Sequence, residues 1–237
     1  MQKAILALES PWEKVSYGSR STTILPFLTG LERVYADLDV HYSTFFERVG
    51  FERGLEYVLS GNEDRRLLYI AAHGCSGDGY VNGATIAEDS FRSLVNRLGK
   101  HGRIKNKVEG IVFGCCEVGE LIPQMVSILD KRTFLAPCWI FAYRHAIDWL
   151  PSTLIDTVIM QMFLSGKRME EKEFILKKFV RALSCFNGRW EMATDLNGDG
   201  SRMPLRESIV LLARDERWNN AVNLTDDLIK ELGWSKD

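Results

Sequence analysis

The sequence lacks an excess of positive charge and any long apolar run, and each absence excludes a class of protein. The 30 Lys and Arg residues are balanced by 32 Asp and Glu residues, so no overall basic field attracts nucleic acid. No apolar run approaches the roughly 18 residues needed to span a bilayer. We therefore expect neither nucleic acid nor a membrane among the partners.

The N-terminal stretch also lacks the features of a signal peptide. Its apolar part, AILALE, is short and includes an acid, and no small-residue cleavage site follows it. We interpret residues 3–9 as the first strand of the fold instead.

A disulfide framework is missing as well. The chain has an odd number of cysteines at irregular spacing, namely Cys75, Cys115, Cys116, Cys138 and Cys185. This usage predicts a reducing compartment, and we expect a cytoplasmic protein. There is no C-x-x-C motif, and the histidines do not form a zinc-ligand spacing with the cysteines, so we expect no structural zinc.

Strand-like and helix-like segments alternate along the 237 residues, which are enough to bury a substantial core. Apolar runs predict strands at 3–9, 37–45, 65–74, 109–115 and 136–144. Helical spacing predicts helices within 22–37 and at 51–60, 90–100, 121–132, 152–165 and 170–186. The alternation predicts one α/β domain over 1–237 with a mainly parallel sheet and helices on both faces. At about 166–237 we expect a helical C-terminal extension.

Two of the predicted strands end in reactive residues. LLYIAAHG ends in His73 and Gly74, and IVFGCC ends in Cys115 and Cys116. Chemistry in open α/β sheets gathers beyond the carboxyl ends of the strands, so neighbouring strands would bring the histidine and a cysteine together. A nearby imidazole can either remove the thiol proton or hold an ion pair with the sulfur. A glycine after the histidine lets the main chain approach a substrate closely.

A structural role is the alternative for each of these residues, because free cysteine is among the most buried residue types. We assign that role to Cys115, which we expect to point into the sheet, and the chemistry to Cys116, because His73 falls at the matching place. The remaining histidines lack such a context and are treated as structural or exposed: His41, His101 and His145.

The two motifs resemble those of the caspase-like, clan CD cysteine peptidases, which include legumains, separases and bacterial CHAT-domain proteases. GCCEVG (114–119) is similar to the EACESG of legumains and the ACETG of CHAT domains. IAAHGCSGDG (70–79) matches the strand, His-Gly and Gly-rich loop of the family. The resemblance covers roughly residues 3–165 and implies a caspase-like three-layer fold.

The resemblance also implies roles for individual residues. Cys116 takes the nucleophile position, His73 that of the general base or acid, and Gly119 that of the closing glycine. The N–H groups of Gly74 and Cys116 would form the oxyanion hole.

The segment HAIDWLPS contributes a candidate substrate pocket. Asp148 and Trp149 resemble the Ser-Trp-Arg segment at the substrate-binding edge of caspases, but Leu150 replaces the arginine, which argues against a preference for acidic residues. Asp148, together with Glu9 or Asp78, could pair with Lys or Arg of a substrate. The alternative for Asp148 is a solvated loop carboxylate.

A second motif lies near the C-terminus. Asp195, Asn197, Asp199 and Gly200 have the D-x-N-x-D-G spacing of a calcium loop, whose alternate oxygens can converge on one hard cation. The acid expected at the twelfth position is displaced by one residue, to Glu207. The motif therefore predicts either a calcium site or a turn without metal.

The sequence thus favours a Cys-His endopeptidase that cleaves protein or peptide substrates, with a weak preference for a basic residue before the scissile bond. The chemistry needs no cofactor, and calcium is the one metal the sequence suggests. The family resemblance implies gating by a small ligand, by calcium or by a protein partner. The alternatives are a non-catalytic caspase-fold sensor or adaptor, and a different acyl-transfer enzyme that uses the same pair.

Overall fold

The computed structural model describes most of the chain: residues 1–11, 22–74, 108–130, 137–166, 171–194, 202–214 and 220–234, and the backbone of 85–86. Some of the predicted features lie outside the described residues. These are the helix at 90–100 and the candidate site residues Asp78, Asp195, Asn197 and Asp199.

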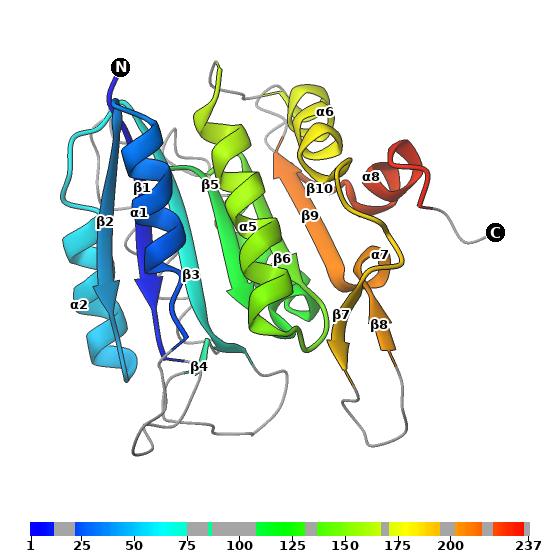
Figure 1. Cartoon of the computed structure of the whole chain (residues 1–237), viewed down its shortest axis with the longest axis horizontal. Helices are drawn as coiled ribbons and strands as arrows, with labels where there is room; N and C mark the ends of the chain where they lie inside the picture. Colours follow the sequence, from blue (N-terminus) through cyan, green and yellow to red (C-terminus); the bar gives the residue numbers. More distant parts are fainter. Residues whose placement is uncertain are drawn as a thin grey trace.

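In the described part of the chain, a mixed sheet with seven strands along its main path forms the centre of the molecule (Figure 1). From one edge to the other, its strands are β2 (Leu38–Thr44), β1 (Lys3–Glu9), β3 (Arg65–Gly74), β5 (Val108–Cys115), β6 (Trp139–Tyr143), β9 (Ile209–Arg214) and β10 (Ala221–Asn223). The first five are parallel, β9 runs antiparallel to β6, and β10 runs antiparallel to β9. The short strand β4 (Thr85–Ile86) pairs with the end of β3.

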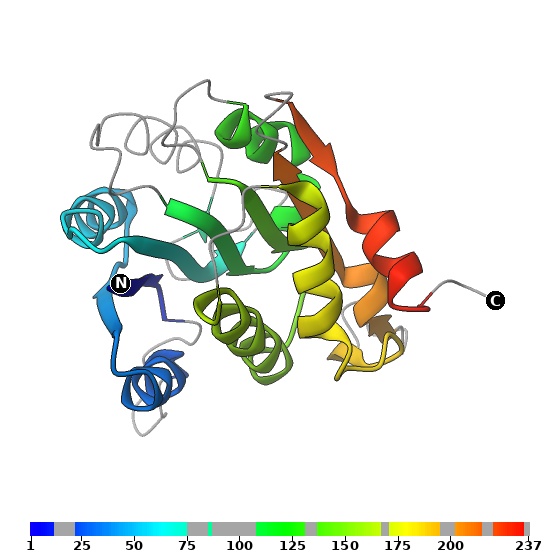
Figure 2. The same ribbon diagram turned by 90° about the horizontal axis from the view of Figure 1, so that it is seen from above.

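Helices cover both faces of the sheet (Figure 2). One face carries α1 (Leu25–Val34), α5 (Trp149–Leu164), α6 (Lys172–Leu183) and α8 (Thr225–Glu231), and the other carries α2 (Arg48–Val58) and α4 (Ile122–Leu129). Successive strand residues enter opposite layers, as the pleat requires: Ile5 packs in the α1/α5/α6 layer and Leu6 in the α2/α4 layer. The predicted α/β architecture, with a mainly parallel sheet between two helical layers, is confirmed.

The C-terminal part of the chain is not the helical extension that we predicted. It contributes β9 to the main sheet, between β6 and β10. Residues 209–213 of β9 are at most 1% exposed. Their sequence, IVLLA, is a continuous apolar run of the kind that a strand buried on both faces requires. Beyond residue 166 the chain therefore completes the core.

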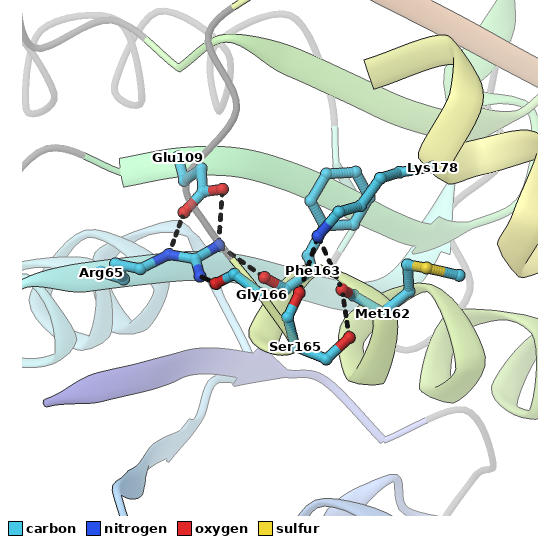
Figure 3. A network of polar contacts seen from close by, with 7 residues as sticks. All are labelled: Arg65, Glu109, Met162, Phe163, Ser165, Gly166 and Lys178. Carbon is cyan, nitrogen blue, oxygen red and sulfur yellow. Dashed lines mark hydrogen bonds and ion pairs between the residues drawn. The ribbon is translucent and has the colours of Figure 1, made fainter. Parts of the chain in front are cut away.

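Arg65 anchors the C-terminal end of α5 to the sheet (Figure 3). Its guanidinium forms a bidentate ion pair with Glu109 of β5, with both N–O distances at 2.8 Å. It also donates to the carbonyl oxygens of Phe163, at 2.6 Å, and of Gly166, at 2.5 Å. The last carbonyl groups of a helix have no partner within it, so the cation both satisfies them and complements the helix dipole.

A second cation acts at the same helix end. Lys178 of α6 donates to the carbonyl oxygens of Met162, at 3.3 Å, and of Ser165, at 2.7 Å (Figure 3). Together with Arg65 it fixes the position of α5, whose opposite end lies at the candidate site.

In the described part of the chain, no helix has the length and apolar character needed to cross a bilayer.

Candidate active site

The strand that carries His73, β3, and the strand that leads into Cys116, β5, are parallel neighbours, as the predicted site requires. Ala72 of β3 is the register partner of Cys115 of β5. His73 and Cys116 each follow by one residue, so their main chains lie side by side where the pairing of β3 with β5 ends.

At Gly74, the main chain of β3 comes into close contact with the main chain of Cys116. A Cβ atom at residue 74 would lie 1.7 Å from the carbonyl oxygen of Cys116 and 3.2 Å from its nitrogen. No side chain fits there, so a glycine is required for the two main chains to approach. The structure therefore brings together three predicted site residues: His73, Gly74 and Cys116.

The pleat directs the two reactive side chains to the same face. Ala72 and Cys115 are buried in the α2/α4 layer. Cys116 packs against the α1/α5/α6 layer. His73, one residue after Ala72, alternates to the face that Cys116 occupies, and it is partly exposed. Cys115 is 0% exposed and its thiol donates to the carbonyl oxygen of Ile70 at 3.3 Å, which confirms the buried role expected for it.

A sharp turn follows Cys116. Glu117 has φ 61°, in the left-handed region that a residue with a Cβ rarely occupies, at a cost of roughly 1–2 kcal/mol. The 3₁₀ helix η2 (Val118–Glu120) begins directly after it. Gly119 presses this helix against the end of β6, because a Cβ there would lie 2.8 Å from the carbonyl carbon of Tyr143. The turn thus begins at the residue after Cys116, which itself directly follows the end of β5.

The sulfur of Cys116 lies against the main chain of Ile147. The Ile147 N–H donates to Sγ at 3.4 Å, and the thiol is 3.8 Å from the Ile147 carbonyl oxygen. Burial raises the pKa of the Cys116 thiol, and the negative charges of Glu117 and Asp148 raise it further, whereas the Ile147 hydrogen bond lowers it. The net effect is upward, so the resting thiol is protonated at neutral pH.

Asp148 and Trp149 stand at the start of α5, next to this thiol. Asp148 is the exposed N-cap residue, and its side chain makes no capping hydrogen bond. Its main-chain N–H donates to the carbonyl oxygen of Met192 in β7 (Glu191–Thr194) at 2.6 Å. Trp149 is partly buried and makes an edge-to-face contact with Phe27 of α1, with ring centroids 6.0 Å apart. Helix α5 begins at Trp149, three residues before the predicted start at residue 152.

Glu9, the other described candidate for the pocket, is 2% exposed. Its carboxylate accepts hydrogen bonds from Thr23 Oγ1 at 2.5 Å, from the Tyr42 hydroxyl at 2.6 Å and from the Ile24 N–H at 2.9 Å. The Ile24 bond satisfies a free N–H group where α1 begins. These contacts give Glu9 a structural role.

A buried carboxylate that we did not predict lies beneath the site. Asp156 of α5 is 0% exposed and accepts hydrogen bonds from the hydroxyls of Tyr143, at 2.7 Å, and Tyr69, at 3.3 Å. Desolvation raises its pKa to about 7, although the two tyrosine hydrogen bonds lower it. Gly114, two residues before Cys116, leaves room for this cluster, since a Cβ there would be 2.5 Å from the Tyr69 hydroxyl.

The candidate calcium loop connects two strands. β7 ends at Thr194, which pairs with Arg202 at the start of β8 (Arg202–Pro204), so a hairpin flanks the loop on both sides. Glu207 lies beyond it, on the short helix α7 (Leu205–Ser208), with Oε1 3.7 Å from Nε of Arg206. Among the described residues, no group of three or more His, Cys, Asp or Glu side chains could hold a metal ion.

Comparison of the chain with known protein families gives no match, and comparison with curated proteins gives none either.

Proposed function

We propose that the protein is a cysteine endopeptidase with a caspase-like fold, in which Cys116 is the nucleophile and His73 transfers protons. One observation carries the proposal: the contact between Gly74 and the main chain of Cys116, at the ends of two adjacent parallel strands. This main-chain contact supports a histidine and a thiol that act together at the carboxyl edge of the sheet.

The raised pKa of the Cys116 thiol favours one of the two roles open to the histidine. Because burial raises the pKa of Cys116, a preformed thiolate–imidazolium pair is disfavoured. His73 then acts as a general base, taking the thiol proton as Sγ attacks the peptide carbonyl carbon.

The remaining steps follow from this assignment. The N–H groups of Gly74 and Cys116 would donate to the oxyanion of the tetrahedral intermediate. His73 returns its proton to the departing amine as the C–N bond breaks, which leaves a thioester on Cys116. Water, deprotonated by His73, then attacks the thioester and releases the carboxylic acid product and the free thiol.

The charge around the thiol favours a basic substrate side chain. Glu117 and Asp148 both act on Cys116 as negative charges, and Asp148 is exposed. A Lys or Arg side chain before the scissile bond would compensate both charges. We leave Glu9 out of this proposal because its carboxylate is occupied at the start of α1. Replacing Asp148 by Asn is expected to weaken the preference for basic residues in a peptide library.

The alternative is a non-catalytic sensor or adaptor built on the same fold. The observation that favours it is the hydrogen bond from Ile147 to a sulfur that is already protonated and partly buried. A calcium ion in the loop between β7 and β8 remains a proposal on the sequence motif, tested by calorimetric titration with Ca²⁺.

Labelling with a peptidyl acyloxymethyl ketone separates the two functions. We expect one adduct, at Cys116 by mass spectrometry, which is lost in His73→Ala. The exposed Cys185 serves as an internal reference for non-specific alkylation. Equal labelling of Cys116 and Cys185, unchanged by His73→Ala, would favour the adaptor.

A further inference from the structure

We infer that residues 144–148 form a latch that holds Cys116 in a resting state, in which the thiol reacts slowly until the latch shifts. The inference rests on the proposed function, which it deepens by locating the gate in the chain. The latch joins the end of β6 to the start of α5.

The first part of the argument is the contact with the thiol itself. Ile147 presents both of its main-chain polar groups to Sγ, with the N–H at 3.4 Å and the carbonyl oxygen at 3.8 Å. A sulfur engaged in this way has fewer free directions from which to approach a carbonyl carbon. The side chain of Ile147 is 5% exposed and packs in the α1/α5/α6 layer, so the contact belongs to the folded core.

The second part is how the latch is held. Its main chain makes three hydrogen bonds to three separate elements: Arg144 N–H donates to Ser208 O of α7 at 2.7 Å, and Asp148 N–H donates to Met192 O of β7 at 2.6 Å. The third joins the latch to the turn after the nucleophile, where Glu117 N–H donates to His145 O at 3.2 Å. Figure 1 shows β7 and α7 at the end of the molecule where α5 begins.

Through these hydrogen bonds, the segment that contacts the thiol is connected to β7 and α7, which carry neither Cys116 nor His73. A ligand or partner that displaces β7 or α7 breaks one latch hydrogen bond without touching Cys116 or His73. The Ile147 main chain then leaves the sulfur, which gains the freedom to attack. The gate is therefore a short main-chain segment whose release is transmitted from the β7–β8 hairpin or from α7.

A proline at residue 148 tests the latch. Asp148 has φ −74°, close to the roughly −65° of proline, so Asp148→Pro removes the N–H that bonds Met192 while matching φ at residue 148. Asp148→Ala is the matched control, because it removes the same carboxylate but keeps the N–H. We expect iodoacetamide to alkylate Cys116 about tenfold faster in Asp148→Pro than in Asp148→Ala, which corresponds to about 1.4 kcal/mol. Cys185 should react equally in both.

A second variant tests the latch independently, in case the proline variant does not fold. Ile147→Ala loosens the same segment through its buried side chain, and circular dichroism establishes that each variant is folded. Equal alkylation of Cys116 in Asp148→Pro and Asp148→Ala, with no acceleration in Ile147→Ala, overturns the latch. Peptide cleavage measured in parallel separates the two proposals: acceleration without cleavage supports the latch and contradicts the endopeptidase, whereas cleavage without acceleration contradicts the latch alone.

Discussion

At the scale of single residues, the proposed chemistry depends on the protonation state of one partly buried thiol. Cys116 contacts the Ile147 main chain, and the negative charges of Glu117 and Asp148 act on its thiol. Burial dominates and raises the pKa of the thiol. In the proposed mechanism the histidine therefore removes the proton during attack.

This assignment predicts the pH dependence of alkylation. We expect the rate at Cys116 to rise with pH around a midpoint above the roughly 8.5 of a free cysteine. Asp148→Asn should lower the midpoint by less than one pH unit, because it removes an exposed negative charge. Iodoacetamide kinetics followed by peptide mapping measure both. A midpoint near or below neutrality would mean a resting thiolate and would contradict the general-base role.

Gly74 offers a sterically defined test of the contact at the site. In Gly74→Ala the new methyl group would lie 1.7 Å from the carbonyl oxygen of Cys116, so the turn after β5 must move. We expect labelling of Cys116 by the acyloxymethyl ketone to fall at least tenfold. Gly30→Ala is the control, because a Cβ at residue 30 of α1 meets nothing within 4 Å. Equal labelling of the two variants would show that the close approach is unimportant.

Residues of the site differ in how far the sequence predicts them. His73 and Cys116 are recognisable because each follows an apolar run that predicts a strand. The parallel pairing of these two strands, β3 and β5, then brings the two residues to the same edge of the sheet. Ile147 acts through its main chain, and because most residue types carry the same main-chain groups, the sequence does not reveal this contact. Asp156 depends on tyrosines from two other elements, so its burial emerges only from tertiary packing.

At the scale of elements, the position of α5 links the stability of the fold to the site. Its C-terminal end is held by Arg65 and Lys178, and the latch leads into its N-terminal end. Among the predicted elements, β3 is found with its full extent, 65–74, because charge and glycine bound its apolar run. We did not predict β9, because its apolar run, IVLLA, lies within residues 166–237, which we expected to be helical.

Replacing Arg65 is expected to lower the free energy of unfolding by a large amount, part of which a second substitution restores. Arg65→Met leaves the carboxylate of Glu109, which is 4% exposed, without its ion-pair partner, and breaking such a buried pair costs about 3–5 kcal/mol. Adding Glu109→Gln removes the unpaired charge, so the double variant should be more stable than Arg65→Met. Urea unfolding measures both. A double variant less stable than the single one would contradict this account of the anchor.

At the scale of the whole molecule, Asp156 makes the free energy of unfolding depend on pH. Its pKa is raised to about 7 by burial, from an ordinary value of 3.8. Between these values the folded state holds a proton that the unfolded state has lost, so stability falls as pH rises. At about 1.4 kcal/mol per pKa unit, the loss is on the order of 4 kcal/mol by neutral pH.

Asp156→Asn should remove that dependence. The amide can still accept a hydrogen bond from Tyr143 but does not ionise. We expect the difference in unfolding free energy between variant and wild type to shift in favour of the variant as pH rises from 4 to 7. Urea unfolding across this range measures the shift. Parallel curves for the two proteins would contradict the raised pKa.

Cleavage tests the central claim most directly. A mixture of peptides is incubated with the wild-type protein, with Cys116→Ala and with Cys185→Ala. New termini are read by mass spectrometry under conditions that release the latch, such as the Ile147→Ala background, which keeps the Asp148 carboxylate. We expect cleavage, enriched after Lys and Arg, that is abolished in Cys116→Ala and retained in Cys185→Ala, the control for loss of an exposed thiol. Cleavage that persists in Cys116→Ala, or none in any folded variant, would contradict the account.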